Sequence, residues 1–157
     1  MIPQEVCAVL QTLERAGHEA YAVGGCVRDI LMGKAPHDWD VTTSALPQET
    51  MALFDHFAIP TGLQHGTVTV RSGGLSCEVT TFRTEGDYPD HRHPAAVTFT
   101  RSLREDLQRR DLTVNAMAMD VRGSLHDPFG GQADIRRRIL RCVGEPERRF
   151  QEDALRI

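Results

Sequence analysis

Residues 21–43 have the sequence YAVGGCVRDILMGKAPHDWDVTT, and this stretch decides the expected fold. HEAYAV, which overlaps its start, has the pattern of a short strand that ends in two adjacent glycines. VRDILMG has the pattern of a helix, and DWDVTT, rich in β-branched residues, is typical of a second strand. We therefore expect a strand, a glycine turn, a helix and a second strand in direct succession.

Two acidic residues, Asp38 and Asp40, occupy alternate positions of the second expected strand. Alternate residues of a strand point to the same face, so their carboxylates are expected to lie side by side. Adjacent carboxylates repel each other, and a divalent cation would relieve that repulsion. Mg²⁺ prefers oxygen ligands of this kind and keeps open positions for substrate phosphates. An exposed strand face with two acids is the alternative, and it is the better interpretation of the pair in isolation.

The turn VGGCVRD strengthens the metal-site interpretation. Gly24 and Gly25 would allow the backbone to approach a phosphate closely, and the start of the following helix favours anions. Arg28 adds a guanidinium group that can bind phosphate through two points. The turn lacks the GxGxxG spacing of a dinucleotide site. Together with DWD, it predicts a triphosphate-binding turn that faces a metal site.

The segments on either side predict an α+β domain around a small sheet. We expect helices in residues 4–16, 44–54, 103–117 and 146–157, two strands in residues 65–82 that meet at Gly73 and Gly74, and a further strand in residues 139–143. Residues 84–94 are polar and contain glycine and proline, which is typical of a loop. Glu78, on the second of the paired strands, is either a third metal-binding carboxylate or an exposed strand residue. Trp39 and Phe82 are expected in the core.

Composition sets limits on the class of protein. The 157 residues are 40% hydrophobic and 25% charged, as in ordinary globular domains, and no stretch approaches the roughly 20 apolar residues of a membrane-spanning helix. The four cysteines are scattered without a CxxC pair, which favours reduced thiols in the cytoplasm. The net charge of −4 is unusual for an RNA-binding protein, although residues 101–110 and 136–156 are rich in arginine.

Six motifs, in this order along the chain, resemble those of one enzyme family. They are VGGCVRD, DWDVTT, EVTTFR, DYPDHRHP, RRDLTVNAMAMD and EDALR. This series resembles the bacterial-type CCA-adding enzymes (tRNA nucleotidyltransferases) and the related bacterial poly(A) polymerases, over residues 21–157. The resemblance implies a polymerase-β-like nucleotidyltransferase head, a small mixed sheet flanked by helices, in residues 1–120. Residues 121–157 would begin a helical neck.

The resemblance also implies roles for individual residues at the metal and phosphate sites. Asp38 and Asp40 match the metal-binding catalytic acids of the family's DxD motif, with Glu78 as a third candidate for catalysis. Gly25 and Arg28 match the contacts of the GGxVRD motif to nucleotide phosphate.

Further residues match the motifs that bind and select the nucleotide. Arg110 and Asp111 match the RRD motif, whose arginine helps to bind the incoming nucleotide; the alternative is a local ion pair. Asp153 and Arg156 match the EDxxR motif, which recognises the Watson–Crick edge of the incoming base; the alternative is a pair on one helix face. Residues 84–104 resemble the flexible loop that switches the family from adding C to adding A.

The family resemblance implies template-independent addition of C, C and A to the tRNA 3′ end from CTP and ATP, with Mg²⁺ as cofactor. A bacterial poly(A) polymerase and a head fragment that binds nucleotide without catalysis are the alternatives. A homodimer of the full-length protein is a further option, and no membrane association is expected. Because the family continues into helical neck, body and tail regions after EDALR, activity of residues 1–157 alone is left open.

Overall fold

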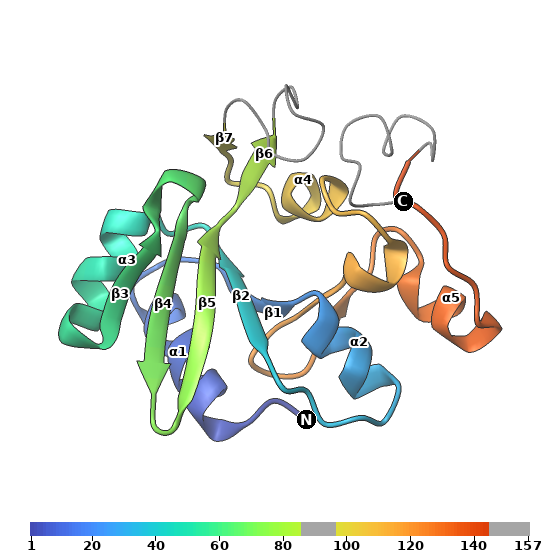
Figure 1. Ribbon diagram of the computed structural model, residues 1–157, viewed down its shortest axis with the longest axis horizontal. Coiled ribbons are helices and arrows are strands. Elements are labelled where there is room, and N and C mark those ends of the chain that lie inside the picture. The colour runs from blue at the N-terminus through green and yellow to red at the C-terminus, as the bar shows by residue number, and fades with distance from the viewer. Residues whose placement is uncertain (86–96, 145–157) are drawn as a thin grey trace.

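A seven-stranded mixed sheet forms the centre of the structure, a computed structural model that describes residues 1–85 and 97–144 (Figure 1). The strand order is β3-β4-β5-β2-β1-β8-β9. The seven strands are β1 (Ala20–Val23), β2 (Trp39–Thr43), β3 (Ala58–Gly62), β4 (Thr67–Ser72), β5 (Leu75–Thr81), β8 (Ala118–Met119) and β9 (Leu125–His126). A separate two-stranded hairpin consists of β6 (Arg83–Glu85) and β7 (Val97–Phe99).

The pairing of β2 with β5 is parallel, whereas the other neighbouring strands of this sheet are antiparallel. Parallel pairing requires a long connection, and here α3, β3 and β4 supply it. In register, Asp40 lies opposite Glu78 on one side and opposite Val23 on the other. The topology thus places the end of β1 and the two acids next to one another.

Helices α1 and α3 cover one face of the sheet (Figure 1). The helices are α1 (Gln4–Arg15), α2 (Gly25–Leu31), α3 (Pro47–Phe54), α4 (Leu103–Gln108) and α5 (Gly131–Arg137), with 3₁₀ turns η1 (Asp55–Phe57), η2 (Leu63–His65) and η3 (Thr113–Asn115). The apolar face of α1 consists of Val6, Val9, Leu10 and Leu13, all buried. They share the main core with Val41 and Val79 of the sheet. Among the described residues, no helix has the length and apolar composition to cross a membrane.

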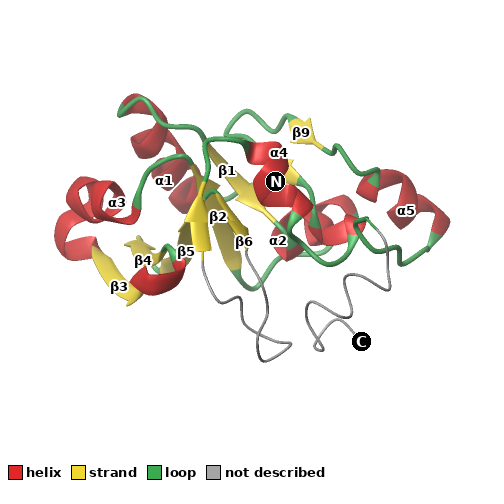
Figure 2. Ribbon diagram, turned by 90° about the horizontal axis from the view of Figure 1, so that it is seen from above, coloured by secondary structure: helices red, strands yellow, loops and turns green. Residues whose placement is uncertain are grey.

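The opposite face of the sheet is polar around Asp40 and apolar around Val23. Register partners in adjacent strands point to the same face, so Val23 shares this face with Asp40. Val23 belongs to a second, smaller core with Leu107 of α4 and Val143. In the view of Figure 2, α1 and α3 lie on one side of β4 and β5 and the start of β6 lies toward the other.

Most of the expected elements are present. The helix in residues 4–16, the strand of DWDVTT, the helix after Ser44 and the hairpin at Gly73 and Gly74 are all confirmed. Trp39 and Phe82 are buried, as expected.

Two expected elements are wrong. Residues 103–117 are not one helix, because α4 ends at Gln108 and the chain continues through η3 into β8. Residues 139–143 do not form a strand, because only Cys142 pairs, in an isolated bridge with Leu112. The expected helix in residues 146–157 lies outside the described residues. β9 and α5 follow residue 120, and the proposed domain boundary there stays a prediction.

Candidate functional site

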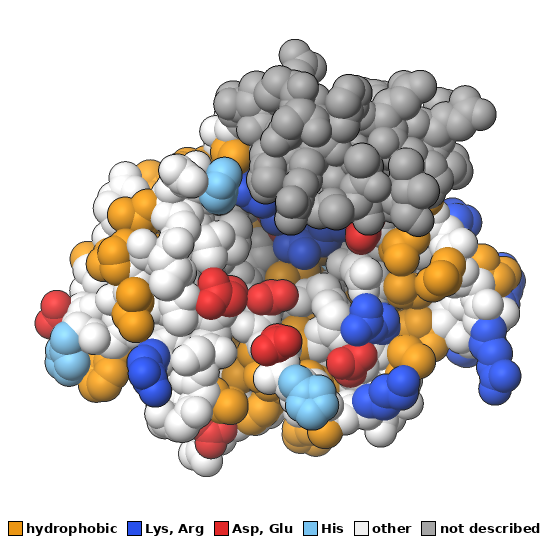
Figure 3. All heavy atoms as spheres, in the orientation of Figure 1, with side chains coloured by type: hydrophobic (Ala, Val, Ile, Leu, Met, Phe, Trp, Pro, Cys, Tyr) orange, Lys and Arg blue, Asp and Glu red, His pale blue; other side chains and the backbone are white. Residues whose placement is uncertain are grey.

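Asp38, Asp40 and Glu78 lie on one exposed part of the sheet. Asp40 on β2 is the register partner of Glu78 on β5, and Asp38 comes directly before β2. All three residues are exposed. Figure 3 shows acidic side chains gathered near the middle of this face, with Lys and Arg side chains close by. The structure therefore brings together three acids that the sequence singled out.

The electrostatic environment of Asp40 disfavours a bare negative charge. Displacement of water by neighbouring atoms raises the pKa of the Asp40 carboxyl, although the residue as a whole is exposed. The guanidinium of Arg110 opposes this rise, whereas the charges of Glu78 and Asp38 add to it. A cation beside Asp40 would relieve both the loss of water and the repulsion.

Two arginine side chains pack against the glycine turn between β1 and α2. Gly24 has φ 81° and ψ −135°, a conformation that is open essentially to glycine. A Cβ atom on Gly25 would lie 3.2 Å from Nη2 of Arg28, and one on Gly24 would lie 3.6 Å from Nη1 of Arg110. Because β1 ends opposite Asp40, the turn, the two guanidinium groups and the acids form one continuous site.

Arg28 is held in place by two neighbours. Its Nη1 donates to Oδ1 of Asn115 at 2.8 Å, and its Nε donates to Oδ1 of Asp29 at 3.2 Å. Asn115 ends η3, as a turn residue would, but its side chain also reaches across to α2. This contact joins two motifs that are far apart in the sequence, and the sequence contained no signal for it.

Asp106 is the most important residue that the sequence analysis did not single out. Its side chain is fully buried and accepts four hydrogen bonds. The donors are Oγ1 of Thr42 at 2.9 Å, the backbone N–H of Arg83 at 3.1 Å, and Nε of Arg109 and Nη2 of Arg110, both at 3.2 Å. It thereby links the strand of Asp40, the start of the β6–β7 hairpin and the arginine pair.

Arg110 pairs with Asp106 and not with Asp111, so the local ion pair considered from the sequence is wrong. Asp111 instead accepts from the backbone N–H of Leu112 at 2.7 Å. The Nε of Arg110 is buried and has no hydrogen-bond partner among the described residues. Burial lowers the pKa of Arg110, as does Arg109, while Asp106 and Asp40 oppose that shift. The spacing of three and four residues between Asp106 and the two arginines was the available signal, because such pairs face each other on a helix.

Glu78 accepts a hydrogen bond from Thr69. The distance from Oγ1 of Thr69 to Oε1 of Glu78 is 2.7 Å. Within residues 1–85 and 97–144, no three His, Cys, Asp or Glu side chains are arranged to hold a metal ion together. Whether Glu78 is a third metal ligand stays a prediction.

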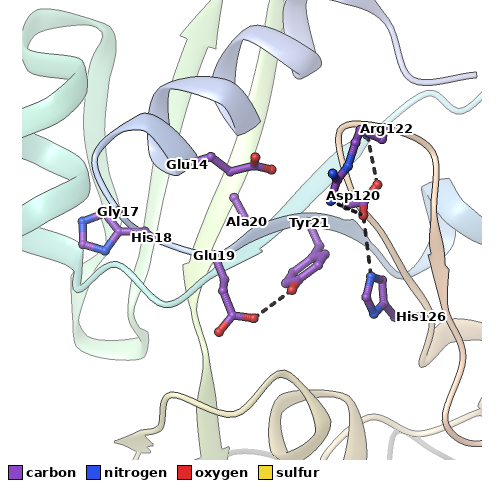
Figure 4. Close-up of a pocket in the computed structure, with 9 residues that line it drawn as sticks. All are labelled: Glu14, Gly17, His18, Glu19, Ala20, Tyr21, Asp120, Arg122 and His126. Atoms are coloured by element: carbon purple, nitrogen blue, oxygen red, sulfur yellow. Dashed lines mark hydrogen bonds and ion pairs between the residues drawn. The ribbon is translucent and has the colours of Figure 1, made fainter.

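A hollow of about 420 Å³ lies at the other end of β1 (Figure 4). Tyr21 donates to Oε1 of Glu19 at 2.7 Å, and its ring meets that of His126 edge-on at 5.0 Å. Oδ2 of Asp120 lies 3.8 Å from Nε2 of His126 and 4.0 Å from Nη2 of Arg122. None of the predicted site residues lines this hollow, so we do not place the reaction there.

Several predicted residues lie outside the described part of the chain. Asp153 and Arg156, predicted to recognise the base, are among them, as is the whole DYPDHRHP motif (residues 87–94) within residues 84–104. Their roles stay predictions.

The chain matches the family of the poly(A) polymerase head domain over residues 20–141. The chain belongs to this family. The match spans the glycine turn, the acids, Asp106 and the arginine pair. The match therefore confirms the family that the motifs implied, and the structure confirms the α+β fold.

Relatives within the poly(A) polymerase head-domain family include CCA-adding enzymes. The chain is 56% identical over 154 residues to that of Geobacillus stearothermophilus, which covers 98% of this chain and 38% of the relative. It is 58% identical over 149 residues to that of Lactobacillus helveticus, covering 95% of this chain and 37% of the relative. The chain thus spans less than two fifths of the length of these curated relatives.

Solved structures agree with this assignment to the poly(A) polymerase head-domain family. The crystal structure of the Bacillus stearothermophilus CCA-adding enzyme in complex with CTP superposes with a TM-score of 0.90 at 52% identity, covering 99% of this chain and 38% of that one. The Thermotoga maritima CCA-adding enzyme complexed with tRNA has a TM-score of 0.76 at 23% identity, covering 99% of this chain and 36% of that one. The second comparison supports the fold alone.

Proposed function

We propose that the protein is a template-independent nucleotidyltransferase that adds C, C and A to the 3′ end of tRNA, using CTP, ATP and Mg²⁺. One observation carries the proposal: two guanidinium groups pack against a glycine turn directly beside a group of exposed carboxylates. Positive groups for a triphosphate and oxygen ligands for a divalent cation thereby share one site. The high identity to CCA-adding enzymes supports the choice of reaction.

The donor set fits magnesium. Asp38 and Asp40 are exposed carboxylates, and the raised pKa of Asp40 means that its negative charge would be stabilised by a nearby cation. Mg²⁺ is commonly held by one or two carboxylates together with substrate phosphates, so a third protein ligand is not required. Asp38 and Asp40 would hold the ion, which when bound neutralises phosphate charge and activates the attacking hydroxyl.

The chain's own residues bind and orient the nucleotide. Gly24 and Gly25 leave room for phosphate oxygens, because neither carries a side chain there. Arg28, fixed by Asn115, and Arg110, fixed by Asp106, would donate to those oxygens. Since both arginines are already restrained, little further ordering is needed when the triphosphate binds.

Base selection is proposed to depend on Asp153 and Arg156. CTP and ATP carry an exocyclic amine beside a ring nitrogen that accepts a hydrogen bond, whereas UTP and GTP present a carbonyl and a protonated nitrogen. A carboxylate that accepts from the amine and a guanidinium that donates to the ring nitrogen would select the first two bases.

The decisive experiment uses the full-length protein with tRNA that lacks CCA, together with Mg²⁺, CTP and ATP. Addition of C, C and A followed by a stop supports the proposal, whereas an open-ended A tail would indicate a poly(A) polymerase. Asp40→Asn is expected to abolish incorporation while the protein stays folded. Glu105→Gln, which removes one exposed carboxylate from α4, is the matched control and is expected to stay active. Substantial activity of Asp40→Asn would refute the assignment of the metal site.

A cytoplasmic location follows from the proposed tRNA substrate and the scattered cysteines. A homodimer of the full-length protein is a prediction for light scattering in solution.

A further inference from the structure

We propose that Thr69 is a positioning residue for Glu78, and that Thr61 supports it in turn. The inference rests on the proposed function, because it assigns Glu78 a place in the nucleotidyl-transfer site. It adds a line of two hydroxyl groups, Thr61 on the edge strand β3 and Thr69 on β4, that ends at the Glu78 carboxylate on β5.

The hydrogen bonds define the direction of this line. Oγ1 of Thr69 lies 2.7 Å from Oε1 of Glu78 and 2.7 Å from Oγ1 of Thr61. A hydroxyl group has one proton to donate. An ionised Glu78 can only accept, so Thr69 donates to Glu78 and Thr61 donates to Thr69. Each strand pairing puts these side chains on one face, since Thr69 lies opposite Glu78 and Glu78 lies opposite Asp40.

Burial distinguishes Thr69 from its partners. Its exposed fraction is 8%, whereas Thr61 and Glu78 are exposed. An exposed glutamate ordinarily samples several rotamers, and fixing them costs free energy. A donor from a buried, β-branched residue with few rotamers of its own restrains Oε1. Oε2 of Glu78 has no hydrogen bond within the described chain, so it remains for the site beside Asp40.

The edge strand β3 has an irregular register at Thr61. The register between β3 and β4 shifts between Ile59, which faces Thr69, and Gly62, which faces Thr67. Two residues of β3, Pro60 and Thr61, thus stand opposite a single residue of β4. Such bulges redirect side chains, and proline is tolerated there because it donates no backbone hydrogen bond. Thr61, two residues after Ile59, lies on the face that carries Thr69, and its Oγ1 contacts Oγ1 of Thr69 beside the bulge.

The direction from which the RNA 3′-hydroxyl attacks explains the role of the Thr69–Glu78 hydrogen bond. Arg28 and Arg110 place the triphosphate on the β1 side of Asp40. The attacking hydroxyl of the RNA must approach from the side opposite the leaving pyrophosphate. That side is β5, where Glu78 stands. We infer that Thr69 keeps Glu78 oriented toward the metal and the RNA 3′-hydroxyl.

The test compares Thr69→Val with Thr67→Val in the full-length protein. Thr67, two residues before Thr69 in β4 and farther from the acids, makes a similar cross-strand contact, with its Oγ1 3.0 Å from Oγ1 of Thr80. Thr69→Val is expected to lower the rate of CMP incorporation by about 10- to 100-fold, as is typical for residues that orient a metal site. It is also expected to weaken Mn²⁺ binding, measured by electron paramagnetic resonance, without changing KM for CTP. Thr67→Val should change none of these, and Thr69→Ser should restore them.

A double mutant separates positioning from general structural damage. If Thr69 acts through Glu78, Thr69→Val combined with Glu78→Gln should be no slower than Glu78→Gln alone. Equal rates and equal Mn²⁺ affinities for Thr69→Val and Thr67→Val would overturn the proposal. If the unaltered protein adds no nucleotide, the proposed function fails, while the Mn²⁺ measurement still tests the role of Thr69. The proposal would also be refuted if Thr69→Ser lost as much thermal stability as Thr69→Val and did not restore the rate of CMP incorporation.

Discussion

Replacement of Asp106 by asparagine is expected to destabilise the protein strongly, although the two side chains have nearly the same shape. The buried carboxylate accepts from two guanidinium groups, one hydroxyl and one backbone N–H. An asparagine offers one oxygen and directs an NH₂ group at the remaining donors. At least two of the four donors then lose the carboxylate oxygen, and the buried guanidinium of Arg110 loses its ion-pair partner, although Asp40 still opposes the burial of its charge.

The magnitude follows from these losses. Each buried donor without a partner costs about 1–3 kcal/mol, and breaking a buried ion pair costs about 3–5 kcal/mol in total. We expect Asp106→Asn to lower the free energy of unfolding by about 3–5 kcal/mol, a large part of the roughly 5–15 kcal/mol of a typical domain. Glu105→Gln, which removes the same charge from the exposed neighbouring position, should change it by less than about 0.5 kcal/mol.

The dependence on pH provides a second measurement. Burial alone would raise the pKa of the Asp106 carboxyl, but Arg109, Arg110 and the hydrogen bonds outweigh it, so the net pKa is lowered. A carboxyl with a lowered pKa in the folded state stabilises the protein above its unfolded pKa of about 3.9, and this stabilisation is lost as the pH falls through the folded value. The difference between the original protein and Asp106→Asn should therefore shrink below about pH 4.

Urea denaturation at pH 7 and at several lower pH values measures both effects. Our reasoning would be refuted by an Asp106→Asn variant as stable at pH 7 as Glu105→Gln. A difference that stays constant down to pH 2 would contradict the role of the carboxylate charge.

Three further predictions concern other parts of the chain. Gly24→Ala should destabilise the protein by about 1–3 kcal/mol in urea denaturation. An added Cβ atom would meet no clash, so the cost comes from the positive φ of Gly24 alone. Gly74→Ala, at a position without a positive φ, should be nearly neutral. Burial raises the pKa of the Cys77 thiol to about 11, so iodoacetamide at pH 8 should modify the half-buried Cys142 long before Cys77, as seen by mass spectrometry. Asp153→Ala in the full-length protein should relax the preference for C and A over U and G in competitive incorporation; an unchanged preference would leave Asp153 as a surface acid.

Elements with a clear local pattern could be predicted from the sequence. The helix of Val6, Val9 and Leu10 and the strand of Asp40 depend on periodicity and propensity, which are local properties. The single helix expected in residues 103–117 failed for a physical reason. Leu103, Leu107, Val114 and Met117 have helical spacing, but the chain turns after α4 so that β8 can pair with β1. That pairing is long-range, and periodicity does not report it.

The candidate site was predictable to the extent that its residues belong to short motifs. Asp38, Asp40, Gly24, Gly25 and Arg28 all come from one stretch of sequence. The residues that hold the side chains of the site do not, because Asn115 binds Arg28, Asp106 binds Arg110 and Thr69 binds Glu78 through contacts between different segments. A buried aspartate is also unexpected in a helix until its donors are known.

The parallel pairing of β2 with β5 has a consequence for how the protein folds. Asp40 and Glu78 meet only after α3, β3 and β4 have formed the long connection between their strands. Closing a connection of this length costs entropy before the new contacts repay it, so such pairings tend to form late. The glycine turn and Asp40, in contrast, lie on adjacent strands joined by one short helix. A growing or partly folded chain would therefore bring the glycine turn and Asp40 together first, whereas Glu78 and Arg110, which come later in the chain, would complete the site only when the sheet has closed.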